Sequence, residues 1–248
     1  MSPGKRGMRN VAGRVPTILA VLATASAATA GPAVAQVMDD HVYTYASFDE
    51  LEYAHGFGER PVEYDGQAWI GGDYDRLWLK ARGEHSTLET EGGFELEALD
   101  SRTVSAYWNL QSGLRLDRGY GEGDGVTRGL AAFGVEGLAP YWFEVEAFAY
   151  VSHEGDVSAR LEASYELLFT QRLILEPEVE LGLAVQDVPA FGVASGLDEL
   201  ELGARLRYEF VRELAPYVGI SWVRQELPEG PVGSVSDASF VAGVRLWY

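Results

Sequence analysis

No cysteine occurs in the 248 residues of this sequence. We therefore expect no disulfide bonds, no thiolate metal ligands and no lipid-modified cysteine of a lipoprotein, so that stability has to come from the fold itself. Basic residues are also few, with 19 Lys and Arg against 38 Asp and Glu. This balance argues against binding to nucleic acid, because neutralising phosphates requires a surface rich in Lys and Arg.

The first 35 residues have the pattern of a signal peptide. A basic amino end is followed by a short apolar run over 15–30, and Ala33-Val34-Ala35 has the small-x-small pattern of a cleavage site. A retained transmembrane helix fits less well, because the run is short, rich in alanine and interrupted by proline. Cleavage would give a mature chain that begins near Gln36, with 15 basic and 38 acidic residues and a net charge of −23.

Beyond this segment, apolar residues recur at every second position, which is the period of a β-strand. In residues 199–210 one face carries Leu200, Leu202, Ala204, Leu206, Tyr208 and Phe210, and the other carries Glu199, Glu201, Arg205, Arg207 and Glu209. Soluble antiparallel sheets alternate in the same way. These strands, however, are about 12 to 15 residues long, whereas roughly 5 to 6 are usual in globular proteins and 9 to 11 cross a bilayer. The sequence therefore predicts an all-β fold, a transmembrane antiparallel β-barrel.

The predicted barrel has about twelve strands, an even number as in single-chain bacterial barrels. They cover 48–56, 66–73, 76–85, 93–102, 106–118, 128–138, 141–152, 156–169, 172–186, 197–211, 215–226 and 237–248. Connections after odd-numbered strands are mostly long and those after even-numbered strands are tight, as in a barrel whose termini both lie in the periplasm. Pro177 lies inside the ninth strand, where it cannot donate a hydrogen bond, and predicts a bulge or a local break.

Aromatic residues gather at the strand ends that this numbering places on the periplasmic side, as in the girdles of outer-membrane barrels. They are Trp78, Tyr107, Trp108, Tyr141, Trp142, Phe143, Phe169, Phe210, Tyr217, Trp247 and Tyr248. The last strand is amphipathic and ends in an aromatic residue, like the segments that the barrel-assembly machinery reads. We therefore predict a signal peptide (1–35), a short periplasmic N-terminal extension (36–47) and an outer-membrane β-barrel (48–248), with outer-membrane lipid and the barrel-assembly machinery as partners.

Closing the sheet turns the apolar rows to lipid and the charged rows to the lumen, because Arg or Lys at the bilayer midplane costs roughly 2 to 4 kcal/mol. The charged lumen residues on the longest strands are Glu176, Glu178, Glu180, Glu199, Glu201, Arg205 and Arg207. Two interpretations are open. The charges pair with one another and fill the barrel, or they form a conduit that attracts cations. We favour pairing, because arginines recur among the carboxylates on the same rows.

Nine collinear segments also carry a resemblance to a known family. They are 48–53 (FDELEY), 65–69 (DGQAW), 71–73 (GGD), 77–80 (LWLK), 137–144 (GLAPYWFE), 165–175 (YELLFTQRLIL), 195–197 (SGL), 201–203 (ELG) and 240–247 (FVAGVRLW). Together they resemble the copper resistance protein B family, outer-membrane proteins of bacterial copper-resistance operons. The resemblance covers about residues 38–248.

The resemblance implies a periplasmic extension rich in Met and His, which binds copper and helps to sequester it or move it across the outer membrane. Here the extension is short, and only Met38 and His41 match the family's Met-Asp-x-His pattern. Thioether and imidazole suit copper ions, but one of each is too few for a tight site. His55, His85 and His153 fall at the predicted outer mouth and are further candidate copper ligands. Three unrelated surface histidines are the simpler interpretation, because their strands are not neighbours.

From this resemblance we expect a copper resistance and copper homeostasis protein in the outer membrane of a Gram-negative bacterium, with copper ion as its ligand and a periplasmic copper protein as a candidate partner. An enzyme is not predicted. Neither a Gly-x-Ser-x-Gly elbow nor a His-Glu-x-x-His motif occurs, and Ser152-His153 is only a pair adjacent in sequence. The alternative is a general small-solute channel or a structural barrel without copper specificity.

Overall fold

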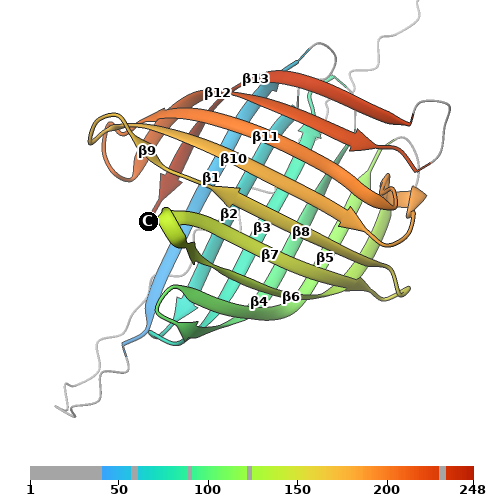
Figure 1. The fold of residues 1–248 in the computed structure, drawn as a ribbon, viewed down its shortest axis with the longest axis horizontal. Helices are drawn as coiled ribbons and strands as arrows, with labels where there is room; N and C mark the ends of the chain where they lie inside the picture. Colours follow the sequence, from blue (N-terminus) through green and yellow to red (C-terminus); the bar gives the residue numbers. More distant parts are fainter. Residues whose placement is uncertain (1–40, 57–60, 89–90, 122–124, 229–232) are drawn as a thin grey trace, which may run out of the picture. The chain divides into compact units, whose positions relative to one another are not determined.

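The structure, a computed structural model, describes residues 41–56, 61–88, 91–121, 125–228 and 233–248. These residues form one antiparallel β-sheet that closes on itself (Figure 1). Among them no helix is long and apolar enough to span a membrane. The predicted signal peptide and Met38 lie outside the described residues and remain predictions.

The sheet is built from long strands. They are β1 (Tyr43–His55), β2 (Pro61–Gly71), β3 (Asp75–Ser86), β4 (Gly92–Ser105), β5 (Trp108–Tyr120), β6 (Val126–Ala139), β7 (Phe143–Ser152), β8 (Val157–Ser164), β9 (Leu167–Leu168), β10 (Leu173–Ala184), β11 (Gly196–Tyr208), β12 (Leu214–Glu226) and β13 (Ser234–Trp247). Two short 3₁₀ turns, η1 (Pro140–Trp142) and η2 (Pro189–Phe191), lie in connections. Consecutive strands pair with each other, except that β8 and β9 both pair with β10, and β1 pairs with β13 to close the ring.

The short strand β9 continues β8 beyond a two-residue interruption, and both pair with β10 in one register. The wall therefore consists of twelve antiparallel strands, which confirms the predicted fold. The interruption lies opposite Pro177: Tyr165 donates its N–H to the Pro177 carbonyl over 3.1 Å, and proline has no N–H to return. The sequence placed the break inside the strand of Pro177, and this was wrong: β10 is continuous from Leu173 to Ala184, and the interruption lies in the neighbouring strand.

The barrel begins earlier than the sequence predicted. Residues 43–47 pair with residues 67–71 of β2 and are part of β1, whereas we placed them in the N-terminal extension (36–47). The backbone hydrogen bonds to β2 and β13 carry the strand down to Tyr43, because the partner strands extend that far. The barrel boundary predicted at residue 48 was therefore five residues too late.

The two faces of the wall follow the predicted alternation. Leu114 and Phe240 point outward and are 69% and 73% exposed, whereas Arg205, on the inner face of β11, is 7% exposed. Large apolar side chains on the outside and charged ones on the inside are the reverse of a water-soluble protein. This arrangement fits a barrel whose outer surface is covered by lipid.

The two ends of the barrel differ in their connections. At one end, here called the turn end, the strands are joined by 72–74, 106–107, 140–142, 169–172 and 209–213. The other end, the loop end, carries 56–60, 87–91, 121–125, 153–156, 185–195 and 227–233. Both ends of the barrel domain meet at the turn end, where Tyr248 donates its N–H to the Ala46 carbonyl over 2.8 Å. The turn-end connections are shorter on the whole, but 209–213 is as long as 56–60, 87–91 and 121–125, so the expected alternation of short and long connections is only partly present.

Most of the predicted aromatic girdle is exposed around the turn end: Tyr107, Tyr141, Trp142, Phe143, Phe169, Phe210 and Tyr248. Three members were assigned to the wrong face. Trp78 and Tyr217 are only 6% and 5% exposed, because they occupy inward positions of β3 and β12. Trp247 lies on the inward face of β13, two residues after Arg245. The odd or even position of a residue along its strand, rather than the apolar character of the ring, decides which side an aromatic residue faces.

Candidate functional site in the barrel lumen

The first strand contains a β-bulge that brings two consecutive acidic side chains into the lumen. The pairing of β1 with β2 shifts register between Phe48 and Glu50, and Asp49 and Glu50 both line the same inner cavity. In a regular strand consecutive side chains face opposite sides, so one of the two carboxylates would meet lipid. The bulge thus avoids a lipid-facing charge and adds a carboxylate to the lumen.

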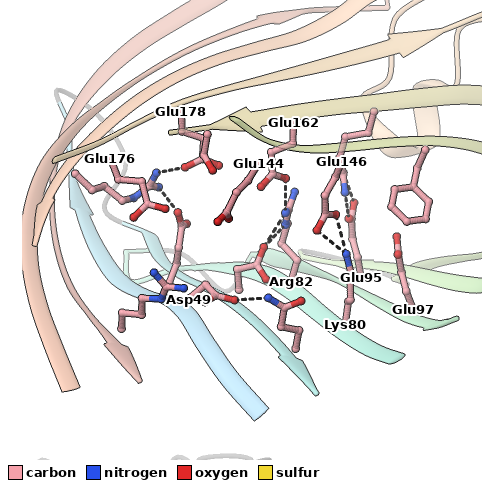
Figure 2. A pocket seen from close by; sticks show the side chains of 18 of the residues that line it. Asp49, Lys80, Arg82, Glu95, Glu97, Glu144, Glu146, Glu162, Glu176 and Glu178 are labelled. Atoms are coloured by element: carbon pink, nitrogen blue, oxygen red, sulfur yellow. Dashed lines mark hydrogen bonds and ion pairs between the residues drawn. The ribbon is translucent and has the colours of Figure 1, made fainter. Parts of the chain in front are cut away.

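This inner cavity has a volume of about 170 Å³ and is mainly charged (Figure 2). Its carboxylates are Asp49, Glu50, Asp65, Glu95, Glu97, Glu144, Glu146, Glu162, Glu176 and Glu178, and its cations are Lys80, Arg82, Arg160, Arg205, Arg207 and Arg245. Ten acidic side chains against six basic ones leave the cavity negative when all are ionised. The surroundings therefore favour cations over anions.

Arg82 on β3 joins three carboxylates from different strands. Its guanidinium lies 2.7 Å from Asp65, 2.9 Å from Glu162 and 2.9 Å from Glu180. Arg160 on β8 shares Glu180 at 2.9 Å. The planar fork of a guanidinium allows this bridging, because its N–H groups point in several fixed directions.

Arg160 and Arg115 extend this network toward β4 and β5. Arg160 binds Glu95 at 2.8 Å, and Arg115 contacts the same carboxylate. Arg115 also lies 2.6 Å from Asp117, which binds Arg128 at 2.8 Å. Charges of alternating sign therefore run without interruption along this part of the inner wall.

A second group surrounds Arg205 of β11. Glu50, Glu52 and Glu178 lie 2.8, 3.1 and 2.7 Å from its guanidinium. The Glu52 side chain is fully buried, so that Arg205 is its counter-charge in a place that water does not reach. Unpaired, such a carboxylate would be very unfavourable.

Arg207 and Arg245 form a third group nearer the turn end. Arg207 contacts Glu166 and Glu176, while Arg245 lies 3.2 Å from Asp49 and 3.6 Å from Glu166. Glu166 belongs to the interruption between β8 and β9. Glu166 thus stands between two arginines.

Lys80, the single lysine beyond the predicted signal peptide, reaches across the lumen from β3. Its Nζ lies 2.7 Å from Glu146 and 3.4 Å from Glu136, and Figure 2 shows it directed at Glu146. The ammonium is also 5.6 Å from the ring centre of Trp78 and 5.4 Å from that of Phe148. Two carboxylates and two aromatic faces therefore stabilise this one charge.

Five glutamates stand directly opposite one another on neighbouring strands. Glu136 pairs with Glu146, Glu146 with Glu162, Glu162 with Glu180, and Glu180 with Glu201. Like charges in such positions destabilise a sheet. Lys80 and Arg82, inserted from the far wall, compensate the first four, and Glu201 accepts a hydrogen bond of 2.7 Å from Ser221.

A larger vestibule of about 840 Å³ lies toward the loop end and is lined by residues of many strands, among them Glu63, Glu199 and Glu201. Part of its wall comes from the 185–195 connection, which includes η2. In that connection Asp187 accepts an N–H bond of 2.6 Å from Ser195. This hydrogen bond lowers the pKa of Asp187, because it stabilises the ionised carboxylate.

Aromatic side chains occupy part of the inner wall near the turn end. The ring centres of Trp78 and Trp69 are 6.1 Å apart, those of Trp69 and Tyr45 6.1 Å, and those of Tyr45 and Trp247 6.3 Å. Trp78 also packs with buried Leu99, Leu130, Ala132, Phe148 and Tyr150. One side of the lumen is therefore filled by an apolar cluster, which confines the charged space to the other side.

The lumen residues named from the sequence fall into the two cavities. Glu176, Glu178, Arg205 and Arg207 line the inner cavity, and Glu180, Glu199 and Glu201 line the vestibule. The ion pairs show that pairing, the interpretation favoured from the sequence, accounts for most of these charges. The excess of carboxylates shows that pairing is incomplete.

The candidate copper ligands are not brought together. His55, His85 and His153 all lie at the loop end, but β1 and β3 are separated by β2, which puts His55 and His85 more than about 10 Å apart at the backbone. His85 lies 3.3 Å from the Tyr120 hydroxyl, and His153 lies 3.3 Å from the Gly129 carbonyl.

His41 lies just before β1, at the opposite end of the barrel, with its ring 6.2 Å from that of Tyr43. In the described parts of the chain, no group of three or more His, Cys, Asp or Glu side chains is arranged to hold a metal ion. The four histidines therefore do not converge on one site.

Two central residues of the lumen were missed in the sequence. Lys80 and Arg82 make the cross-lumen contacts, yet neither was among the predicted lumen residues. Their inward positions could be predicted, because Trp78, Lys80 and Arg82 alternate with Leu77 and Leu79 and therefore lie on the opposite face of the strand. Their partners were not readable, since these come from strands far away in the sequence.

Comparison with known proteins agrees with this architecture. The family model for the copper resistance protein B precursor matches residues 42–248. The copper resistance protein B homolog of Pseudomonas syringae pv. tomato is 38% identical over 218 residues, which is 86% of this chain and 72% of that protein. Copper resistance protein B of Escherichia coli is 37% identical over 223 residues, with the same shares of 86% and 72%.

Among solved structures, the NanC porin is similar, with a TM-score of 0.53 and 13% identity over 82% of this chain and 99% of that chain. At this identity the likeness concerns the fold alone. The family match is of a different kind, because it extends over the whole described barrel at the level of sequence. The chain therefore belongs to the copper resistance protein B family.

Proposed function

We propose that this protein lies in the outer membrane of a Gram-negative bacterium and acts in copper resistance and copper homeostasis, by binding copper ions and sequestering them or moving them across that membrane. Membership of the copper resistance protein B family is the observation that carries the proposal. The lipid-suited outer face and the barrel fold support the location. Both termini of the barrel domain would then lie on the periplasmic side, as in single-chain bacterial barrels.

The lumen is suited to attract copper ions as cargo. Its inner cavity has more carboxylates than cations, and a cleft of one charge sign with low-dielectric walls raises the local concentration of the opposite charge. Carboxylates are hard ligands, whereas Met38 and His41 offer the softer atoms that copper prefers. We therefore place first capture at Met38 and His41 and electrostatic attraction in the lumen.

The proposal is tested by growth of a deletion strain across copper concentrations. We expect growth to fail at lower copper than in the parent strain, and the full-length gene to restore it. A complementing gene with Met38→Ala and His41→Ala should restore growth only in part, whereas His55→Ala, His85→Ala and His153→Ala together serve as the matched control. A deletion strain as copper-tolerant as its parent would refute the proposal.

A general small-solute channel without copper specificity is the second candidate, because the vestibule of about 840 Å³ could admit small solutes. Conductance of the purified barrel, measured with and without copper, separates the two functions. Under either function the partners we propose are outer-membrane lipid and the barrel-assembly machinery, and for copper a periplasmic copper protein. Catalysis is not part of the proposal.

A further inference from the structure

Ion pairs cross the lumen between opposite walls of the barrel. Following the ring from β3 through β4 to β8 and then β10 takes six steps, and the way back through β2, β1, β13, β12 and β11 also takes six. Arg82 of β3 nevertheless lies 2.9 Å from Glu180 of β10. The two side chains therefore bridge the full width of the barrel.

A second crossing lies beside the first. Arg160 of β8 binds Glu95 of β4 at 2.8 Å, four strands away in the ring. The two crossings are joined, because Arg160 and Arg82 share Glu180 at 2.9 Å each. Asp65, Arg82, Glu180, Arg160 and Glu95 thus form a continuous chain of alternating charges, here called the ionic partition.

The ionic partition separates the two cavities of the lumen. Asp65, Arg82, Glu95 and Arg160 line the inner cavity on one side and the vestibule on the other. The inner cavity has only about 170 Å³ against about 840 Å³ for the vestibule. An ion that enters from the loop end therefore meets these bonded side chains before it reaches the inner cavity.

A partition of this kind can open without unfolding of the wall. Its members are side chains on rigid strands, and the strands pair through backbone hydrogen bonds that do not involve them. The interior of an eight-stranded barrel is filled by side chains, whereas a barrel of 16 to 18 strands encloses an aqueous channel. A barrel of twelve strands lies between the two, so that the side chains in its lumen decide whether a channel is open. Release of one guanidinium would remove the obstruction.

We propose that the ionic partition is the gate of the barrel, and that Arg82 holds it shut by joining opposite walls. This inference rests on the proposed function, because it names what controls passage through the same lumen. Arg82 is the central member, since it binds Asp65, Glu162 and Glu180 together. No other cation of the partition joins strands that face each other across the whole ring.

The test is single-channel conductance of the refolded full barrel in planar bilayers with potassium chloride. The wild type is expected to conduct weakly, and Arg82→Ala to conduct severalfold more. Glu180→Gln keeps the shape of the side chain but removes the charge that Arg82 and Arg160 share, and it should raise conductance in the same direction. If Arg82→Ala does not refold, Glu180→Gln decides the outcome.

Arg102→Ala is the matched control. Arg102 pairs with Asp75 at 3.0 Å on the rim, where the side chains are 70% and 61% exposed, so its loss should leave conductance at the wild-type level. Variants in the partition that conduct no more than the wild type would overturn the gate. This result would leave the copper proposal intact, because that proposal depends on the growth of the deletion strain and not on conductance.

Discussion

Individual cations hold the lumen together because each one serves several carboxylates. Arg205 is the clearest case, with three acidic partners on two other strands. Removing one partner of a buried pair leaves the opposite charge without compensation. The free energy lost in this way is larger than the net free energy that the intact pair contributes to stability. The contribution of such a residue is therefore seen mainly when it is lost.

We predict that Arg205→Ala lowers the free energy of unfolding by about 3 to 5 kcal/mol, because it leaves buried carboxylates unpaired. Unfolding of the refolded barrel in urea, followed by intrinsic fluorescence, measures the change. Arg224→Ala is the control, since Arg224 pairs with Glu226 in a more exposed position and should cost no more than about 1 kcal/mol. Equal losses in the two variants would contradict the prediction.

Among the strands, β8, β9 and β10 show how one residue shapes a whole element. Pro177 lies within β10, which stays continuous from Leu173 to Ala184, while its neighbour is split into β8 and β9. An N–H at position 177 would have donated to the Tyr165 carbonyl. The N–H of Tyr165 still donates to the Pro177 carbonyl. We therefore attribute the division of one long strand into two pieces to this single absent donor.

We predict that Pro177→Val restores this hydrogen bond, joins β8 and β9 into one strand and stabilises the barrel by about 0.5 to 1.5 kcal/mol. Amide hydrogen exchange around residues 165–167 is the measurement, and slower exchange is expected in the variant. A Val substitution at Pro216 of β12 is a control, because no strand interruption lies opposite that proline. Exchange that stays as fast as in the wild type would show that the break has another cause.

The molecule as a whole is inside out relative to a water-soluble protein. Its outer face is apolar along the strands, and its charges are collected in the lumen. Such a chain is stable only if lipid covers the outside and if the ring is closed, because an open sheet edge would leave backbone groups unsatisfied in the bilayer. Location in a membrane and closure of the barrel are thus one physical requirement.

We predict that Leu114→Arg, in the middle of β5, destabilises the barrel in lipid by about 2 to 4 kcal/mol, as expected near the bilayer midplane. Leu77→Arg, close to the turn end on β3, should cost about 0 to 1 kcal/mol because the headgroup region solvates the charge. Urea unfolding in lipid vesicles measures both. A cost that does not depend on the position along the strand would argue against a spanning barrel.

Much of this architecture was readable in the sequence. Alternation of apolar and charged residues determined the strands, their number and which face meets lipid, because the two faces of a strand are set by parity alone. A disturbance caused by Pro177 was readable for the same local reason, but the break lies in the neighbouring strand and not in the strand of Pro177, where it was predicted. The faces of Trp78 and Tyr217 were open to the same argument, and they were misassigned because aromatic character was given more weight than parity.

What the sequence determined is therefore a strand pattern with a lipid face and a charged face. The tertiary structure alone decided the bulge that turns both Asp49 and Glu50 inward, the row of opposed glutamates, and the meeting of Arg82 with Glu180. These features depend on strand register and on closure of the ring, which places β3 opposite β10. No local pattern encodes contacts between residues about a hundred positions apart, because such contacts arise only when the barrel closes.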